Sequence, residues 1–101
     1  MSDGDAAEIV RLARQAIELG NDDPDTLGIA SIILSAFVGE HETAAAGIDR
    51  ALKLNPNSAL AWRAHGYLSC FRNRPGPAIK AFQHAMQLSP LDPLGWMVTA
   101  G

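Results

Sequence analysis

The sequence has one cysteine, no run of basic residues and no hydrophobic stretch long enough to cross a membrane. Cys70 cannot form an internal disulfide, and without a CxxC spacing or a histidine cluster we expect an ordinary half-buried thiol. The net charge is −3, which argues against nucleic acid and anionic lipid surfaces as partners. The longest apolar stretch, Leu27 to Val38, falls well short of the ~20 residues that span a bilayer.

Charged residues are also scarce, at 19% against 48% apolar residues. This proportion supplies one continuous hydrophobic core and leaves too little charge for a disordered tail. We therefore expect residues 1–101 to form a single domain. The acidic start of the sequence, residues 1–5, lacks the basic and apolar segments of a secretory signal, so we expect a cytoplasmic location.

Motifs of catalysis are missing too. The sequence contains no GxxxxGK[ST], GxGxxG, HExxH or GxSxG pattern, and these patterns carry phosphate, dinucleotide, zinc and acyl chemistry. His65 and Cys70 lie on one predicted helix but about 140° apart around its axis. We expect His41 in a solvated turn and His84 on a water-facing side of a helix. The sequence therefore predicts no enzyme activity, no metal site and no other cofactor.

What the sequence does contain is an internal repeat with an offset of 34 residues. A fixed offset of this size is typical of stacked pairs of helices. The matching residues are of structural types, which makes a chance origin hard to sustain. The identical pairs are Ala44 with Ala78, Ala51 with Ala85, Leu54 with Leu88, Pro56 with Pro90, Leu60 with Leu94 and Trp62 with Trp96.

Helix boundaries follow from the residues between the apolar stripes. Asn55 and Ser89 each stand directly before a proline, which ends a helix at that point. Short polar residues, which are favoured N-caps, then precede the next helices, and they are Asp23 or Asp25, Ser58 and Asp92. No strands are expected. The predicted helices cover residues 5–19, 25–38, 43–54, 58–72, 76–88 and 92–100, with short turns at 39–42 and 73–77.

The segment 59–90 carries a recognisable set of spaced residues. The set consists of Trp62, Gly66, Ala78, Phe82, Ala85 and Pro90. This spacing resembles the tetratricopeptide repeat family, whose pattern is W-x2-L-G-x2-Y, A-x3-F and P. His65 and Ser69 depart from it, because they stand where the family has leucine and tyrosine.

The resemblance extends over most of the chain. It implies an all-α fold, an α-solenoid of antiparallel helix pairs in a right-handed superhelix, with about two full repeats and a half-repeat at each end. The parts are a partial repeat at 6–22, a degenerate repeat at 25–58, a clear repeat at 59–92 and a truncated repeat at 93–101. The phrases at 55–62 and 89–94 are also similar to repeat regions attached to bacterial adenylate cyclases and related signalling proteins.

The same resemblance implies a concave groove, lined by the first helix of each pair, that binds a protein or peptide partner. Only Arg63 offers the kind of side chain with which some members capture a C-terminal carboxylate, so an apolar or helical segment is the favoured ligand. Arg63 and Tyr67 are of types common in interface hot spots. The groove positions are Thr26, Ile29, Ile33, Ala36, Phe37, Leu60, Arg63, Tyr67, Cys70 and Phe71.

Alternatives stay open for this assignment. Ile29, Ile33 and Phe37 could instead pack against neighbouring helices, and Arg63 could be a solvated surface charge. Two further functions are a self-associating module and a regulatory or sensory appendage of a larger bacterial signalling enzyme. Self-association would use the apolar residues of the last predicted helix, namely Leu94, Trp96, Met97 and Val98, which have no second helix to cover them.

Overall fold

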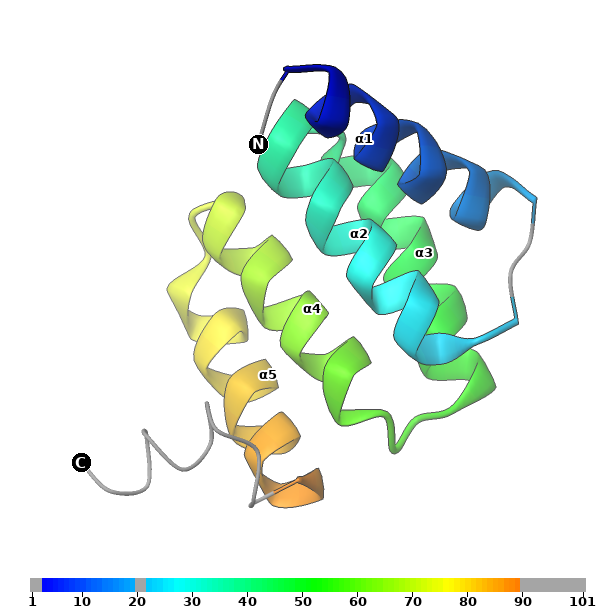
Figure 1. The fold of residues 1–101 in the computed structure, drawn as a ribbon. Coiled ribbons are helices and arrows are strands. Elements are labelled where there is room, and N and C mark those ends of the chain that lie inside the picture. Colours follow the sequence, from blue (N-terminus) through cyan, green and yellow to red (C-terminus); the bar gives the residue numbers. More distant parts are fainter. Residues whose placement is uncertain (1–2, 20–21, 90–101) are drawn as a thin grey trace.

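The computed structural model of the protein describes residues 3–19 and 22–89, and all regular secondary structure in these residues is helical (Figure 1). This confirms the predicted all-α class for the described residues. Every helix begins and ends within two residues of its prediction, and the predicted helix 92–100 lies outside the described residues. The helices are α1 (Asp3–Glu18), α2 (Pro24–Val38), α3 (His41–Leu54), α4 (Ala59–Phe71) and α5 (Pro75–Leu88).

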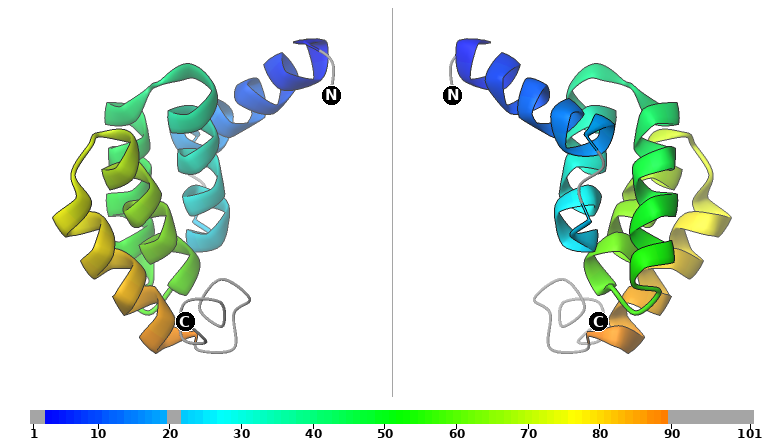
Figure 2. Two further views of the ribbon diagram at one scale, coloured as in Figure 1. Left: turned by 90° about the vertical axis from the view of Figure 1, so that its left-hand side faces the viewer. Right: turned by 90° about the vertical axis from the view of Figure 1, so that its right-hand side faces the viewer.

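Two antiparallel hairpins follow α1. The first hairpin consists of α2 and α3, joined by Gly39 and Glu40, and the second consists of α4 and α5, joined by residues 72–74 (Figure 1). Helix α2 contacts α1, α3 and α4, and α4 contacts α2, α3 and α5. Helices α2 and α4 are therefore the two central elements. Figure 2 shows the N-terminal part of α1 projecting from the side of the first hairpin.

Side chains at the helix starts explain two of these boundaries. Asp23 accepts a hydrogen bond from the Asp25 amide at 3.1 Å, and Ser58 accepts one from the Ala61 amide at 3.1 Å. Ser58 is the predicted N-cap of α4, and Asp23 is one of the two residues predicted for α2. Each satisfies an amide that has no partner within its helix. The Ser58 hydroxyl also lies 3.0 Å from the Asp25 carboxylate oxygen, so the starts of α2 and α4 are joined.

The turns inside the hairpins are shorter than predicted. Helix α3 begins at His41 and α5 begins at Pro75, so parts of the predicted turns 39–42 and 73–77 are helical. Proline is tolerated in the first turn of a helix because its missing N–H would have no partner there. The proline at position 75 therefore starts α5 instead of belonging to the turn before it.

The core recurs along the stack of helices. Ala30 and Leu34 of α2 pack with Val10 and Ala13 of α1. Ala64 and Leu68 of α4, which lie 34 positions later, pack in the same way with Ala44 and Ile48 of α3. A third cluster joins Leu27, Ala51 and Ala61. Each hairpin thus buries one face of its first helix against the helix that precedes it.

Two close approaches require glycine. A Cβ atom at Gly66 of α4 would lie 2.6 Å from Cε1 of Phe82 in α5, so the absence of a side chain lets the Phe82 ring pack directly on α4. A Cβ atom at Gly47 of α3 would lie 2.5 Å from Ser31 Oγ and 3.0 Å from Ile17 Cδ1. Gly47 therefore allows α1, α2 and α3 to meet closely.

An ion pair links α1 to the loop of the first hairpin. The Arg14 guanidinium pairs with the Glu40 carboxylate, and its hydrogen bonds hold the pKa of Glu40 below the ordinary value for a glutamate. Arg50 of α3 pairs with Asp22 at 2.7 Å. Among the described residues, no helix has both the length and the apolar character needed to cross a membrane.

Candidate functional site

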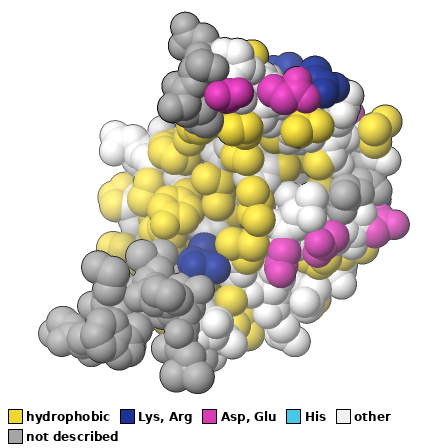
Figure 3. All heavy atoms as spheres, in the orientation of Figure 1, with side chains coloured by type: hydrophobic (Ala, Val, Ile, Leu, Met, Phe, Trp, Pro, Cys, Tyr) yellow, Lys and Arg dark blue, Asp and Glu magenta, His cyan; other side chains and the backbone are white. Residues whose placement is uncertain are grey.

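The predicted groove residues lie on α2 and α4, the two central helices. Within each helix they recur at spacings of three and four residues, which places them on one face. Figure 3 shows hydrophobic side chains gathered over α2 and α4 on the face turned to the viewer. We call these ten residues the α2–α4 surface. None is buried, since Ile29, Ala36, Phe37, Cys70 and Phe71 are exposed and Thr26, Ile33, Leu60, Arg63 and Tyr67 are half-buried.

The three apolar residues of α2 have different roles. Ile29 and Phe37 are 48% and 50% exposed, so their side chains are not buried in the core. Ile33 is partly buried and packs against the cluster between α1 and α2. The alternative of packing against a neighbouring helix therefore holds for Ile33 only. Ile29 and Phe37 are accessible to a partner.

Two aromatic contacts order the side chains that α4 contributes to the α2–α4 surface. The Tyr67 ring meets the Phe82 ring of α5 edge-on, with centroids 5.3 Å apart. Phe71 is 43% exposed, and its ring stacks on His41 at 6.3 Å. Phe71 follows Phe37 by 34 positions, so each central helix has an exposed phenylalanine in its last turn. The ring contacts of Tyr67 and Phe71 order these two side chains, which therefore offer apolar area at a low entropic cost.

Three expectations about polar residues are wrong. Cys70 is exposed, not half-buried, because it lies in the last turn of α4 on the outward face. His41 is the first residue of α3 and is half-buried against Phe71, not a solvated turn residue. His84 is half-buried and not simply a water-facing side chain, because its ring contacts Trp62 of α4.

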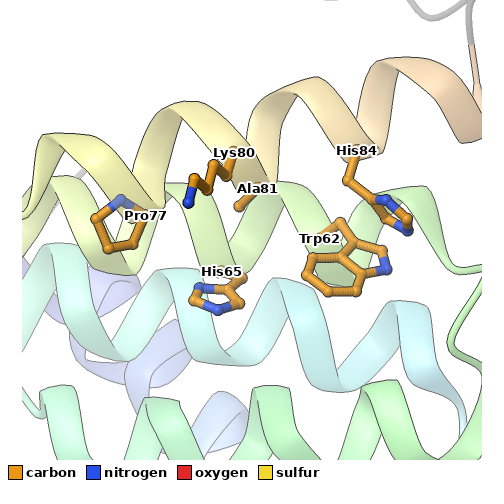
Figure 4. Close-up of a pocket in the computed structure, with 6 residues that line it drawn as sticks. All are labelled: Trp62, His65, Pro77, Lys80, Ala81 and His84. Carbon is orange, nitrogen blue, oxygen red and sulfur yellow. The ribbon is translucent and has the colours of Figure 1, made fainter.

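A pocket of about 350 Å³ lies between α4 and α5 and was not predicted (Figure 4). The indole of Trp62 donates its Nε1–H to the Pro56 carbonyl oxygen at 2.8 Å. The His65 ring stacks on Trp62 with centroids 5.9 Å apart, and the His84 ring meets it edge-on at 4.4 Å. The lining residues are Trp62, His65, Pro77, Lys80, Ala81 and His84.

The two departures from the repeat pattern belong to this region. His65, which stands at the family's leucine position, supplies one wall of the pocket. The hydroxyl of Ser69, at the tyrosine position, donates to the His65 carbonyl oxygen at 3.0 Å. A signal for the pocket was present in the sequence, because residues 59–88 contain four basic residues and no carboxylate, and Trp62, His65 and His84 are among their ring-bearing side chains.

Within residues 3–19 and 22–89, no three His, Cys, Asp or Glu side chains are grouped so that they would hold a metal ion. That the chain is not an enzyme stays a prediction. The segment considered for self-association, Leu94 to Val98, lies outside the described residues.

Comparison of the chain with protein-family models, curated proteins and solved structures gave no match.

Proposed function

We propose that the chain is a short α-solenoid of tetratricopeptide type that binds a protein or peptide partner on its α2–α4 surface. Two features support the solenoid. The equivalent pairs Ala30 with Ala64 and Leu34 with Leu68 pack against successive preceding helices. The family's glycine and phenylalanine positions, Gly66 and Phe82, are in direct contact across the second hairpin.

The observation that carries the binding proposal is the exposed apolar area of the α2–α4 surface. Ile29, Phe37 and Phe71 are each between 43% and 50% exposed, and they lie on adjacent helices. Contiguous exposed apolar area on a folded domain marks an interaction site, because leaving it in water costs free energy that a partner recovers on binding.

The chemistry of this surface indicates the kind of partner. Its exposed rings and aliphatic side chains are suited to the apolar face of a helical segment, which presents anchors at i, i+3 and i+4. Tyr67 and Arg63 add a hydroxyl and a guanidinium at its edge. An apolar helical segment with one acceptor group beside its anchors is therefore the proposed ligand.

The test starts from peptides selected against the wild-type protein from a random displayed library. The affinity of a selected peptide is then measured by fluorescence anisotropy for Phe37→Ser and Phe71→Ser. Because a buried aromatic anchor carries a large share of binding energy, each change is expected to weaken binding by roughly tenfold.

Ile79→Ser is the matched control, because Ile79 is 57% exposed on α5 and lies outside the α2–α4 surface. Its affinity should stay within about twofold of wild type, and thermal unfolding should confirm that all three variants are folded. Equal losses of affinity for Ile79→Ser and the two phenylalanine variants would refute the assigned surface.

A further inference from the structure

We propose that the pocket between α4 and α5 is a second binding site, which takes one carboxylate side chain of an acidic peptide segment together with an adjacent apolar side chain. The site is separate from the α2–α4 surface and does not depend on the function proposed for it. Three properties of the pocket carry the proposal, namely its rigid aromatic wall, its charge and its size.

The aromatic wall is preorganised. Trp62 is fixed by the hydrogen bond from its Nε1–H to the Pro56 carbonyl and by the rings of His65 and His84 on two of its sides. Figure 4 shows the indole and both imidazoles lining the space between the two helices. A wall that is already ordered loses little conformational entropy when an apolar side chain packs against it.

The lining of the pocket carries a positive charge, although the protein as a whole has a net charge of −3. Among the residues that the structure describes, Lys80 lines the pocket and no carboxylate does. Helices α4 and α5 with their connection contain four basic residues, Arg63, Arg72, Arg74 and Lys80, and no Asp or Glu. A carboxylate beside Lys80 would gain a charge-assisted hydrogen bond, and the imidazole N–H groups can add further donors.

The number of cationic groups favours a carboxylate over a phosphate. Phosphate sites commonly use arginine forks, several cations or the amide groups of a helix start. In the part of the chain that the structure describes, the lining contains one lysine and no arginine, and one lysine balances a single negative charge. The volume of about 350 Å³ is at the lower end for ligand pockets, so it suits one or two side chains.

The test reads the fluorescence of Trp62 in the full chain carrying Trp96→Phe, because the sequence contains only these two tryptophans. The probe is a peptide of alternating leucine and glutamate, acetylated and amidated so that its ends are uncharged. We expect a saturable change in Trp62 emission, and binding roughly tenfold weaker for the same peptide with glutamine in place of glutamate.

Lys80→Met and Arg72→Met separate the pocket from general charge attraction. Both remove one positive charge from the second hairpin, but only Lys80 lines the pocket. Lys80→Met should weaken binding of the glutamate peptide roughly tenfold and Arg72→Met less than about twofold. Phe37→Ser should leave this binding unchanged, which distinguishes the pocket from the α2–α4 surface.

Four outcomes would overturn the proposal: no saturable change in Trp62 emission, equal affinity for the glutamate and glutamine peptides, equal losses for Lys80→Met and Arg72→Met, or loss of binding in Phe37→Ser. Inorganic phosphate, compared with chloride at matched ionic strength, tests the chemical class. Displacement of the peptide by phosphate at millimolar concentration would refute carboxylate selectivity.

Discussion

The two hairpins share one helical framework but differ in how one face is filled. In the first hairpin, Gly47 lies against the side chain of Ile17 from α1 and beside Ser31 of α2. The residues 34 positions after Ser31 and Gly47 are His65 and Ala81, and they line a pocket in the second hairpin. The comparison teaches that a repeated backbone pattern does not fix a repeated surface, because a side chain from another helix, Ile17 of α1, fills the face of the first hairpin.

Charge separates the hairpins as well. The first hairpin carries carboxylates at Asp25, Glu40, Glu42 and Asp49, whereas the second carries none and has four basic residues. Residues outside the first hairpin also pair with it, as Arg14 does with Glu40 and Asp22 with Arg50. The Arg14–Glu40 ion pair therefore helps to hold α1 against the first hairpin. The second hairpin has no carboxylate of its own, so an anionic partner for its basic residues has to come from elsewhere.

The largest expected effect concerns the contact that holds the second hairpin together. Gly66→Val should lower the free energy of unfolding by about 3 kcal/mol, because the new side chain would displace the Phe82 ring from α4. Urea denaturation followed by circular dichroism measures the change. Gly76→Val is the control, because a Cβ at Gly76 meets nothing within 4 Å, and a similar loss there would show that the Gly66 contact is not the cause.

A smaller effect is expected where the first hairpin is closed. Ile17→Ala should cost about 2 kcal/mol, because it removes the side chain that packs against Gly47 and leaves a hollow. Leu12 lies on the same helix but is 52% exposed, so Leu12→Ala should change the free energy of unfolding by less than about 0.5 kcal/mol. Equal costs would mean that α1 does not close this face.

The smallest effect concerns pH. The pKa of Glu40 is held below its ordinary value by Arg14, so the folded state binds a proton less readily than the unfolded state does. The ion pair between Glu40 and Arg14 therefore stabilises the fold at neutral pH. This stabilisation is lost as the pH falls below about 4 and Glu40 becomes protonated. Glu40→Gln should make the free energy of unfolding less dependent on pH in that range.

Glu8→Gln gives the comparison for that measurement, because Glu8 pairs with Arg11 within α1 and joins no other element. Its pKa is lowered mainly by the hydrogen bond from Arg11. Denaturation curves between about pH 3 and pH 7 should show a smaller change for Glu8→Gln than for Glu40→Gln. A larger change for Glu8→Gln than for Glu40→Gln would contradict the role of the Glu40–Arg14 ion pair in holding α1 against the first hairpin.

The helices could be predicted from the sequence because their determinants are local. Asn55 before Pro56 ends α3, Ser58 caps α4, and the offset of 34 residues identifies the repeated core positions. The turn predicted at 73–77 was too long because Pro75 starts α5, and a proline that starts a helix looks like a proline in a turn when only the sequence is known. Helical spacing placed Ile29 and Phe37 on one face, but their exposure was expected only from the resemblance to the repeat family, with packing against neighbouring helices as the open alternative.

The remaining features depend on how different helices meet. Ile33 shares its helical face with Ile29, but the way α1 crosses α2 makes it part of the core. The pocket depends on the approach of His84 to Trp62, which lie 22 positions apart on two helices. Spacing within one helix cannot reveal such a meeting, whereas the lack of carboxylates in residues 59–88 was visible and pointed to the same region.

The most direct test of partner binding on the α2–α4 surface is a methyl NMR titration of isoleucine-labelled protein with a selected peptide. The account predicts a large shift change for the δ1 methyl group of Ile29, which is 48% exposed, and little change for Ile79 on α5. Changes concentrated at Ile79, with Ile29 unaffected, would contradict it.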